Sequence, residues 1–234
     1  MDNEINFKTY LLLSPKKLSI VVNNNSETKK FFFEELNITN NSNELDFNLI
    51  EEFLEKNIFK IEKLLNNFIK NIYIILECDQ FLLTQISIKE NNFSNYLFSK
   101  NLKPLLNISK NQCKKTLEGQ KITHMVIDKY KINNKDYNFL PKKVFSENFS
   151  LDISFTSLPI YFLKKIEVIM KKYQISISKV VSYEYLINYF DNEQVDTFEM
   201  AKGIINGQNE NEVHLSPKTR ENVGFFEKFF HFFR

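Results

Sequence analysis

The hydrophobic positions follow a strand period in some parts of the chain and a helix period in others. Short β-rich runs at residues 8–13, 17–22 and 30–38 are separated by Ser-Pro and Asn-rich segments, which predicts a small meander of strands. Between Asp46 and Lys70, apolar residues recur every three or four positions, which predicts an amphipathic helix. Its apolar face is formed by Ile50, Phe53, Leu54, Ile58, Ile61, Leu65 and Phe68.

The rest of the chain continues to mix the two periods. We expect a helical region between Tyr96 and Glu118, interrupted near Pro104 and ended by Gly119 in a left-handed cap. Further strands are expected at 72–77, 83–90 and 149–155, a hairpin at 121–139, and helices at 159–173, 183–190 and 196–208. This mixture predicts an α+β protein with mixed or antiparallel sheets and packed helices.

The last residues, "GFFEKFFHFFR" at 224–234, hold six of the 24 phenylalanines. On a helical wheel at about 100° per residue, all six rings fall in one arc and the polar residues fill the other. Such a helix is about 16 Å long, too short to cross a bilayer but suited to lie in its interface. The expected membrane-binding residues are Phe225, Phe226, Phe229, Phe230, Phe232 and Phe233, together with Lys228 and Arg234.

Two other fates are open for this segment: it could dock on the protein's own core as a last helix, or in a partner's hydrophobic groove. A polar, aperiodic stretch precedes it, and we expect that stretch to be a flexible linker, which suits an anchor better than a closing helix. Glu227 and the terminal carboxylate offset Lys228 and Arg234. We therefore expect lipid binding that is driven by apolar burial and only weakly sensitive to salt.

Composition narrows the function classes. The net charge is +2, and because Lys is offset throughout by Asp and Glu rather than massed on one element, we expect no nucleic-acid partner. No run approaches the roughly 18 apolar residues that span a bilayer, and the acidic start "MDNEINFKTYLLL" is unlike a secretory signal. Cys78 and Cys113 are too few for a disulfide framework, which favours a reducing cytosol.

Two motifs and the order of the elements carry a family resemblance. His124 and Tyr130 match a His-x-x-Pro-x-x-Tyr-x-x-Asp hairpin, with Ile127 and Asn133 in place of the proline and the aspartate. The segment "FEMAKGIINGQ", residues 198–208, is similar to an Ala-x-x-Gly-Leu-Leu helix. In this order the chain resembles the first part of FtsA, an actin-like bacterial cell-division family, together with the subdomain inserted in that fold.

The resemblance implies a partial actin-like fold. Its expected parts are a reduced actin-like subdomain at 1–77 and 177–207, an inserted interaction subdomain at 78–176, a flexible linker at 208–223 and an amphipathic membrane helix at 224–234. It also implies a non-enzymatic peripheral membrane adaptor on the cytoplasmic face of the inner membrane, at midcell. The expected partners are the lipid surface, cell-division proteins and other copies of the chain. The FtsZ-binding part of the family has no counterpart here, so the resemblance does not extend to direct FtsZ binding.

The chemistry of the family's ATPases is not expected in this chain. Their Asp-x-Gly loops hold phosphates through backbone amides, whereas this sequence has "LLLSPKKLSI" at 11–20 and no glycine before Gly119. We therefore expect no nucleotide cofactor and no enzymatic activity. A scaffold of another inner-membrane complex, such as type IV pilus assembly, and a degenerate actin-fold nucleotide-binding protein remain as alternatives.

The reactive side chains of the sequence stand apart from one another along the chain. We expect His124 to be a strand histidine with a satisfied ring rather than a catalytic base, and Cys113 to be a bystander because no base or oxyanion loop accompanies it. Three carboxylates, Asp128, Asp136 and Asp152, are expected at solvated turns and strand edges. No His, Cys and carboxylate spacing predicts a metal site.

Overall fold

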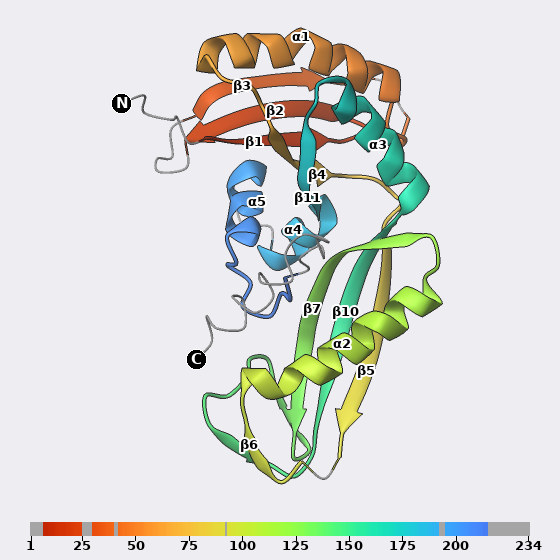
Figure 1. The fold of residues 1–234 in the computed structure, drawn as a ribbon, viewed down its shortest axis with the longest axis vertical. Coiled ribbons are helices and arrows are strands. Elements are labelled where there is room, and N and C mark those ends of the chain that lie inside the picture. The colour runs from red at the N-terminus through yellow and green to blue at the C-terminus, as the bar shows by residue number, and fades with distance from the viewer. Residues whose placement is uncertain (1–6, 25–29, 40–41, 92, 192–194, 215–234) are drawn as a thin grey trace.

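The computed structural model describes residues 7–24, 30–39, 42–91, 93–191 and 195–214, and they form two sheets with helices packed on them (Figure 1). The expected α+β class is therefore confirmed. The first sheet has the order β11-β4-β1-β2-β3. Its strands are β1 (Phe7–Leu13), β2 (Lys17–Asn24), β3 (Lys30–Asn37), β4 (Asn71–Leu76) and β11 (Ser176–Ser182). The first three strands are an antiparallel meander, as expected, whereas β4 runs parallel to both β1 and β11.

Helix α1 (Phe47–Leu65) connects β3 to β4. The Asp46 side chain caps it by accepting the N–H groups of Asn48 and Leu49 at 3.0 and 3.1 Å. Asn66 then takes a left-handed conformation, with φ 48°, and ends the helix. Phe68, which we expected on the buried face, lies beyond this end and is 73% exposed.

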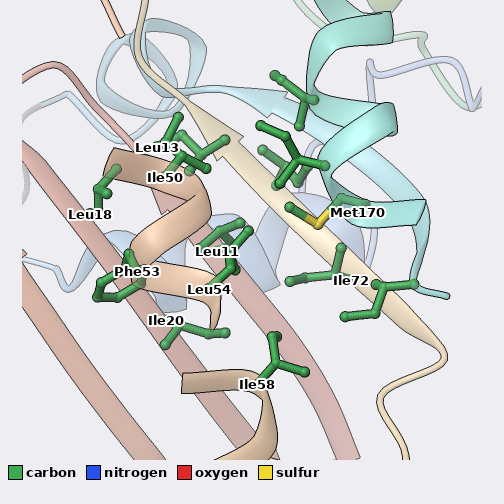
Figure 2. Close-up of a cluster of buried hydrophobic side chains, with 14 of the residues drawn as sticks. Leu11, Leu13, Leu18, Ile20, Ile50, Phe53, Leu54, Ile58, Ile72 and Met170 are labelled. Atoms are coloured by element: carbon green, nitrogen blue, oxygen red, sulfur yellow. The ribbon is translucent and has the colours of Figure 1, made fainter. Parts of the chain in front are cut away.

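Helices cover both faces of the first sheet. Successive side chains of its strands point to opposite sides, so one strand can contribute to both cores. Leu11 and Leu13 of β1 pack with α1 and with α3 (Ile160–Lys172), and Figure 2 shows this core from Leu11 to Met170. On the other face, Tyr10 and Leu12 pack with α4 (Tyr183–Tyr189) and α5 (Thr197–Ile205). The first sheet is thus the middle of three layers.

The second sheet is antiparallel and has the order β5-β10-β7-β8. Its strands are β5 (Leu82–Glu90), β7 (Gln120–Ile132), β8 (Lys135–Tyr137) and β10 (Phe149–Pro159). Helix α2 (Ser99–Thr116) lies across one face of it (Figure 1) and buries Leu102, Leu105 and Cys113 there. A two-stranded ladder, β6 (Asn95–Leu97) with β9 (Val144–Ser146), lies at the end of this sheet that is far from the first sheet.

The expected hairpin is present, since Asn133 and Asn134 both have positive φ, 49° and 64°, and join β7 to β8. The interruption that we expected near Pro104 is not observed. The proline lies inside α2, near its start, where its missing N–H removes one helical hydrogen bond. Gly119 has the expected positive φ of 75°, but it follows the cap residue Leu117 in the turn that leads to β7.

Helix α3 differs from its expected assignment. We expected the inserted unit to extend to residue 176, which places α3 inside it. Instead, the buried side of α3, formed by Phe162, Ile166, Ile169 and Met170, belongs to the core between α1 and the first sheet. The chain therefore returns to the first sheet at the end of β10, because the apolar face of α3 packs on that sheet beside α1.

Candidate functional site

A buried polar cluster joins the two sheets to the segment that follows α5. His124 of β7 is fully buried, and its Nδ1 lies 2.9 Å from Oε1 of Glu212. The backbone N–H of Ser182, at the end of β11, donates to Nε2 of the same ring at 3.1 Å. Since Nε2 accepts, Nδ1 carries the proton and donates to the carboxylate. We call His124, Lys179, Ser182, Tyr185 and Glu212 the junction.

Glu212 is the centre of the junction. Its Oε1 also accepts from Nζ of Lys179 at 3.0 Å, and its Oε2 accepts from the hydroxyl of Tyr185 at 3.3 Å. The Tyr185 ring lies against the His124 ring, with 4.3 Å between centroids. Asn209 donates to the Tyr185 hydroxyl at 2.8 Å and so adds a second side chain of the same segment. The carboxylate is therefore bound by β7, β11 and α4 at once.

The backbone of residues 211–213 is bound as well. The Ile127 N–H donates to the Asn211 carbonyl at 3.0 Å, and the Val213 N–H donates to the Met125 carbonyl at 2.8 Å. This adds a short antiparallel bridge to β7, at Val126 and Glu212. We expected the flexible linker to begin at residue 208; residues 209–213 instead pack on the body, because these hydrogen bonds and the buried Glu212 hold them.

Burial controls the ionisation of the junction. Removal from water lowers the pKa of His124, although the Glu212 carboxylate acts in the opposite direction. Burial also opposes the ionisation of Glu212, but the hydrogen bond from His124 and the charge of Lys179 more than offset it and leave the pKa of Glu212 below its ordinary value. We therefore assign a neutral His124 and an ionised Glu212 near pH 7, which agrees with the hydrogen bond from Ser182.

The junction should make folding sensitive to acid. His124 has a depressed pKa in the fold, so its contribution to stability is complete above about pH 6.5 and is lost as the pH falls below that value, by up to about 1.4 kcal/mol per pH unit. The pKa of Glu212 is also lowered in the fold, so protonation of its carboxylate reduces the stability further at lower pH. Urea unfolding at pH 7.5, 6.5 and 5.5 measures the effect. A His124→Asn variant should have a flatter profile over this range; an equally steep profile would contradict the assignment.

The junction has the geometry of a structural lock rather than a catalytic site. Both ring nitrogens of His124 are bonded to protein groups, as the sequence predicted, so neither is available to a substrate. Sequence reasoning missed Glu212, which lies 88 residues from His124 in a polar stretch without periodicity. The buried Asn209 and Glu212 are both polar and lie three residues apart, so they give neither an apolar period nor the alternation of a strand.

A cleft of about 510 Å³ opens near the β1–β2 turn. It is lined by Pro15, Lys16, Asn43, Leu76, Glu77, Cys78, Asp79, Phe81, Ser182, Tyr183, Glu184, Ile187 and Asn188. Ser14 and Lys17 bond each other's backbone across the turn, at 3.0 and 3.3 Å, and the Lys16 N–H donates to the Ser14 hydroxyl at 3.2 Å. These amides are therefore not arranged as a phosphate cradle.

The charges of the cleft also disfavour a phosphate. Glu77, Asp79 and Glu184 line it against a single cation, Lys16, so an anionic ligand would meet more negative than positive charge. Burial raises the pKa of the Cys78 thiol to about 11, which keeps it protonated. Within the ranges that the structure describes, no three His, Cys, Asp or Glu side chains are placed to hold a metal ion.

The other candidate side chains are kept apart. Cys113 lies on the buried side of α2, and burial raises the pKa of its thiol. Asp128 and Asp152 lie on the outer face of the second sheet, where they accept from Ser154 at 2.5 Å and Ser87 at 2.6 Å. Lys131 pairs with Asp152 at 2.9 Å, and Lys129 pairs with Asp136 at 3.3 Å. The expected membrane residues, Phe225, Phe226, Lys228, Phe229, Phe230, Phe232, Phe233 and Arg234, lie outside the described residues.

The fold and the junction define an α+β protein with a structural polar lock. The sequence matches no protein-family model and no curated protein. Solved structures with a similar arrangement include the cytoplasmic domain of EpsL, an inner-membrane component of the type II secretion system of Vibrio cholerae. That likeness has 10% identity and a TM-score of 0.41, and it covers 77% of this chain and 59% of EpsL.

Two further structures are similar at the same level. A PilM-PilN type IV pilus biogenesis complex matches with 8% identity and a TM-score of 0.48, over 78% of this chain and 49% of that one. A Bacteroides thetaiotaomicron protein with an actin-like ATPase fold and unknown function matches with 15% identity and a TM-score of 0.34, over 81% of this chain and 58% of that one. The chain thus spans about half to three fifths of these structures, and identities this low assign no function to it.

Proposed function

We propose that the protein is a non-enzymatic peripheral membrane adaptor of the FtsA type in bacterial cell division. In this role, residues 224–234 bind the cytoplasmic face of the inner membrane and the two-sheet body binds division proteins or further copies of the chain. The observation that carries the proposal is the segregation of six Phe rings onto one side of the 224–234 wheel. No helix in the described ranges is long and apolar enough to cross a bilayer.

The junction supports this role because it gives the adaptor a defined attachment point. Residues 209–213 are bound to β7 through Glu212 and two backbone hydrogen bonds, so only residues 215–223 separate the described body from the Phe-rich segment. A chain of that length spans at most about 30 Å. The body would therefore stay close to the lipid surface, where a shared anchor raises the effective concentration of neighbouring copies.

The non-enzymatic part of the proposal rests on the cleft. Its turn amides are bonded within the turn, and its lining carries three carboxylates against one lysine. A nucleotide phosphate would lack both the amide cradle and the positive charge that such sites use. These features favour an adaptor over a degenerate nucleotide-binding protein.

The position of the protein in living cells tests the division role. A fluorescent protein fused before residue 1 should gather at midcell with the intact chain, and deletion of residues 224–234 should make it diffuse. An intact fusion that lines the whole membrane or collects at a pole would overturn the division role and favour a scaffold of another inner-membrane assembly, such as a type IV pilus. An unchanged pattern after deletion would overturn the anchor itself.

A further inference from the structure

Helix α2 is the most basic element of the described chain. Its residues, Ser99–Thr116, include Lys100, Lys103, Lys110, Lys114 and Lys115 and no Asp or Glu. The whole chain has a net charge of +2, so the residues outside α2 sum to −3, which is +2 minus +5. We expected lysine to be offset evenly along the chain; α2 departs from that expectation because its acidic residues are missing entirely.

The lysines of α2 lie off its buried stripe, and three of the five are exposed. The buried residues Leu102, Leu105, Ser109 and Cys113 form one stripe against the second sheet. At about 100° per residue, the five lysines fall on the other side of the helix, and Lys100, Lys114 and Lys115 are exposed. We call the side that carries Lys100, Lys103, Lys110, Lys114 and Lys115 the basic face.

Three lysines of the basic face, Lys100, Lys114 and Lys115, carry charges that no ion pair of the described residues neutralises. Burial, and then repulsion from Lys114 and Lys121, lower the pKa of Lys110. An external anionic surface would relieve this repulsion.

Exposed aromatic rings continue the basic face at the start of α2. Tyr96, Phe98 and Phe145 are 43%, 45% and 48% exposed. Tyr96 and Phe145 lie opposite each other in the β6–β9 ladder, with ring centroids 5.8 Å apart. Nζ of Lys143 lies 5.3 Å from the Tyr96 ring centre, and Nζ of Lys100 lies 5.7 Å from that of Phe98. We call Tyr96, Phe98 and Phe145 the aromatic tip.

Asparagine side chains hold the backbone of the aromatic tip through hydrogen bonds. Asn133 donates to the Phe145 carbonyl at 2.8 Å and accepts the Glu147 N–H at 2.9 Å. Asn101 accepts the Phe98 N–H at 2.9 Å. Leu97, between Tyr96 and Phe98, is fully buried, so the alternation of the strand directs its two aromatic neighbours outward.

We propose that the basic face and the aromatic tip form a second membrane contact, which binds anionic lipid headgroups and orients the body on the bilayer. Lysines near an anionic leaflet and aromatic rings at the headgroup level are the two side-chain types that suit this surface. Ile108, on the same helix, is 54% exposed. This favours lipid over nucleic acid as the ligand, because nucleic-acid phosphates attract positive charge but offer no apolar contact to an aliphatic side chain. The proposal deepens the adaptor role and rests on it.

Charge neutralisation tests the basic face in the full chain. Replacing Lys100, Lys114 and Lys115 by Gln should weaken binding to phosphatidylglycerol vesicles at low salt by about fivefold per lysine, or about a hundredfold together. The matched control replaces three exposed lysines of α1, Lys56, Lys60 and Lys63, and should change binding much less. Equal losses in both variants would overturn the proposal. Binding to neutral phosphatidylcholine vesicles, which reports on residues 224–234, should be the same in all three proteins.

A fluorescent reporter tests the aromatic tip independently of residues 224–234. The chain contains no tryptophan, so Phe98→Trp places a unique indole at the tip, and Phe59→Trp, at a 72% exposed site on α1, is its control. A histidine tag before residue 1 holds each variant on nickel-chelating phosphatidylglycerol vesicles with brominated acyl chains. Only the indole of Phe98→Trp should shift to the blue and be quenched.

The outcomes separate the two proposals. An unquenched indole at position 98 on vesicles that hold the protein overturns the second contact, whatever the anchor does. Quenching at position 98, together with failure of the untagged chain to bind neutral vesicles, supports the second contact and overturns the anchor. If duplex DNA or RNA removes the protein from anionic vesicles at equal phosphate concentration, the basic face is a nucleic-acid surface and the lipid proposal fails.

Discussion

Replacing Glu212 by Ala should lower the free energy of unfolding by about 3 kcal/mol or more. The substitution leaves the buried Nδ1–H of His124 without its acceptor and Lys179 without its carboxylate, and it removes the acceptor of the Tyr185 hydroxyl. Removing one partner of a buried charged network typically costs about 3 to 5 kcal/mol, because the remaining groups stay out of water unpaired. Urea unfolding at pH 7.5 measures the loss.

Glu210 provides the matched control. It lies two residues earlier in the same segment but is exposed, so Glu210→Ala should change the free energy of unfolding by no more than about 0.5 kcal/mol. Hydrogen exchange should locate the effect of Glu212→Ala, because the Val213 amide, bonded to Met125, should lose protection first. If the two alanine variants are equally stable, the junction does not hold the segment.

Deleting residues 224–234 should weaken binding to neutral phosphatidylcholine vesicles by at least about a thousandfold. Half-burial of a Phe ring is worth roughly 1 kcal/mol, and six rings together contribute about 6 kcal/mol, from which the cost of ordering a short helix is subtracted. The remaining free energy corresponds to about three orders of magnitude in affinity. Vesicle sedimentation of the intact and shortened chains compares them directly.

The control for this deletion keeps the composition and changes the pattern. A variant of 224–234 with the same residues in an order that spreads the Phe rings around the helical wheel should bind as weakly as the shortened chain. Raising the salt from low to moderate concentration should leave the intact chain bound to neutral vesicles, since the charges of the segment nearly cancel. Loss of most of this binding with salt would contradict the apolar mechanism.

Much of the fold could be predicted because its signals are local. The apolar period from Ile50 to Leu65 identified α1, and the Asn133-Asn134 turn identified the β7–β8 hairpin. Alternation predicted β10, and Pro159 marked the start of α3. In each case a few consecutive residues hold the whole pattern, since burial on one side of a helix or strand repeats every few positions.

Boundaries and assignments were harder to predict. Phe68 continued the period of α1 in the sequence, but the left-handed conformation of Asn66 ended the helix before it. The family resemblance placed helix α3 in the inserted unit, whereas its apolar face packs with α1 on the first sheet. The period of the apolar residues along a helix shows that one face is buried, but it does not show which part of the protein buries that face.

The sequence by itself determined the α+β class, most of the longer helices and strands in chain order, and the amphipathic pattern of 224–234. Only the tertiary structure decided that Glu212 meets His124 and Lys179, and that Lys100 of the basic face lies beside the Phe98 ring of the aromatic tip. The physical reason is that hydrophobic periods are written in neighbouring residues. A polar contact between distant segments depends instead on how the packed sheets bring those segments together.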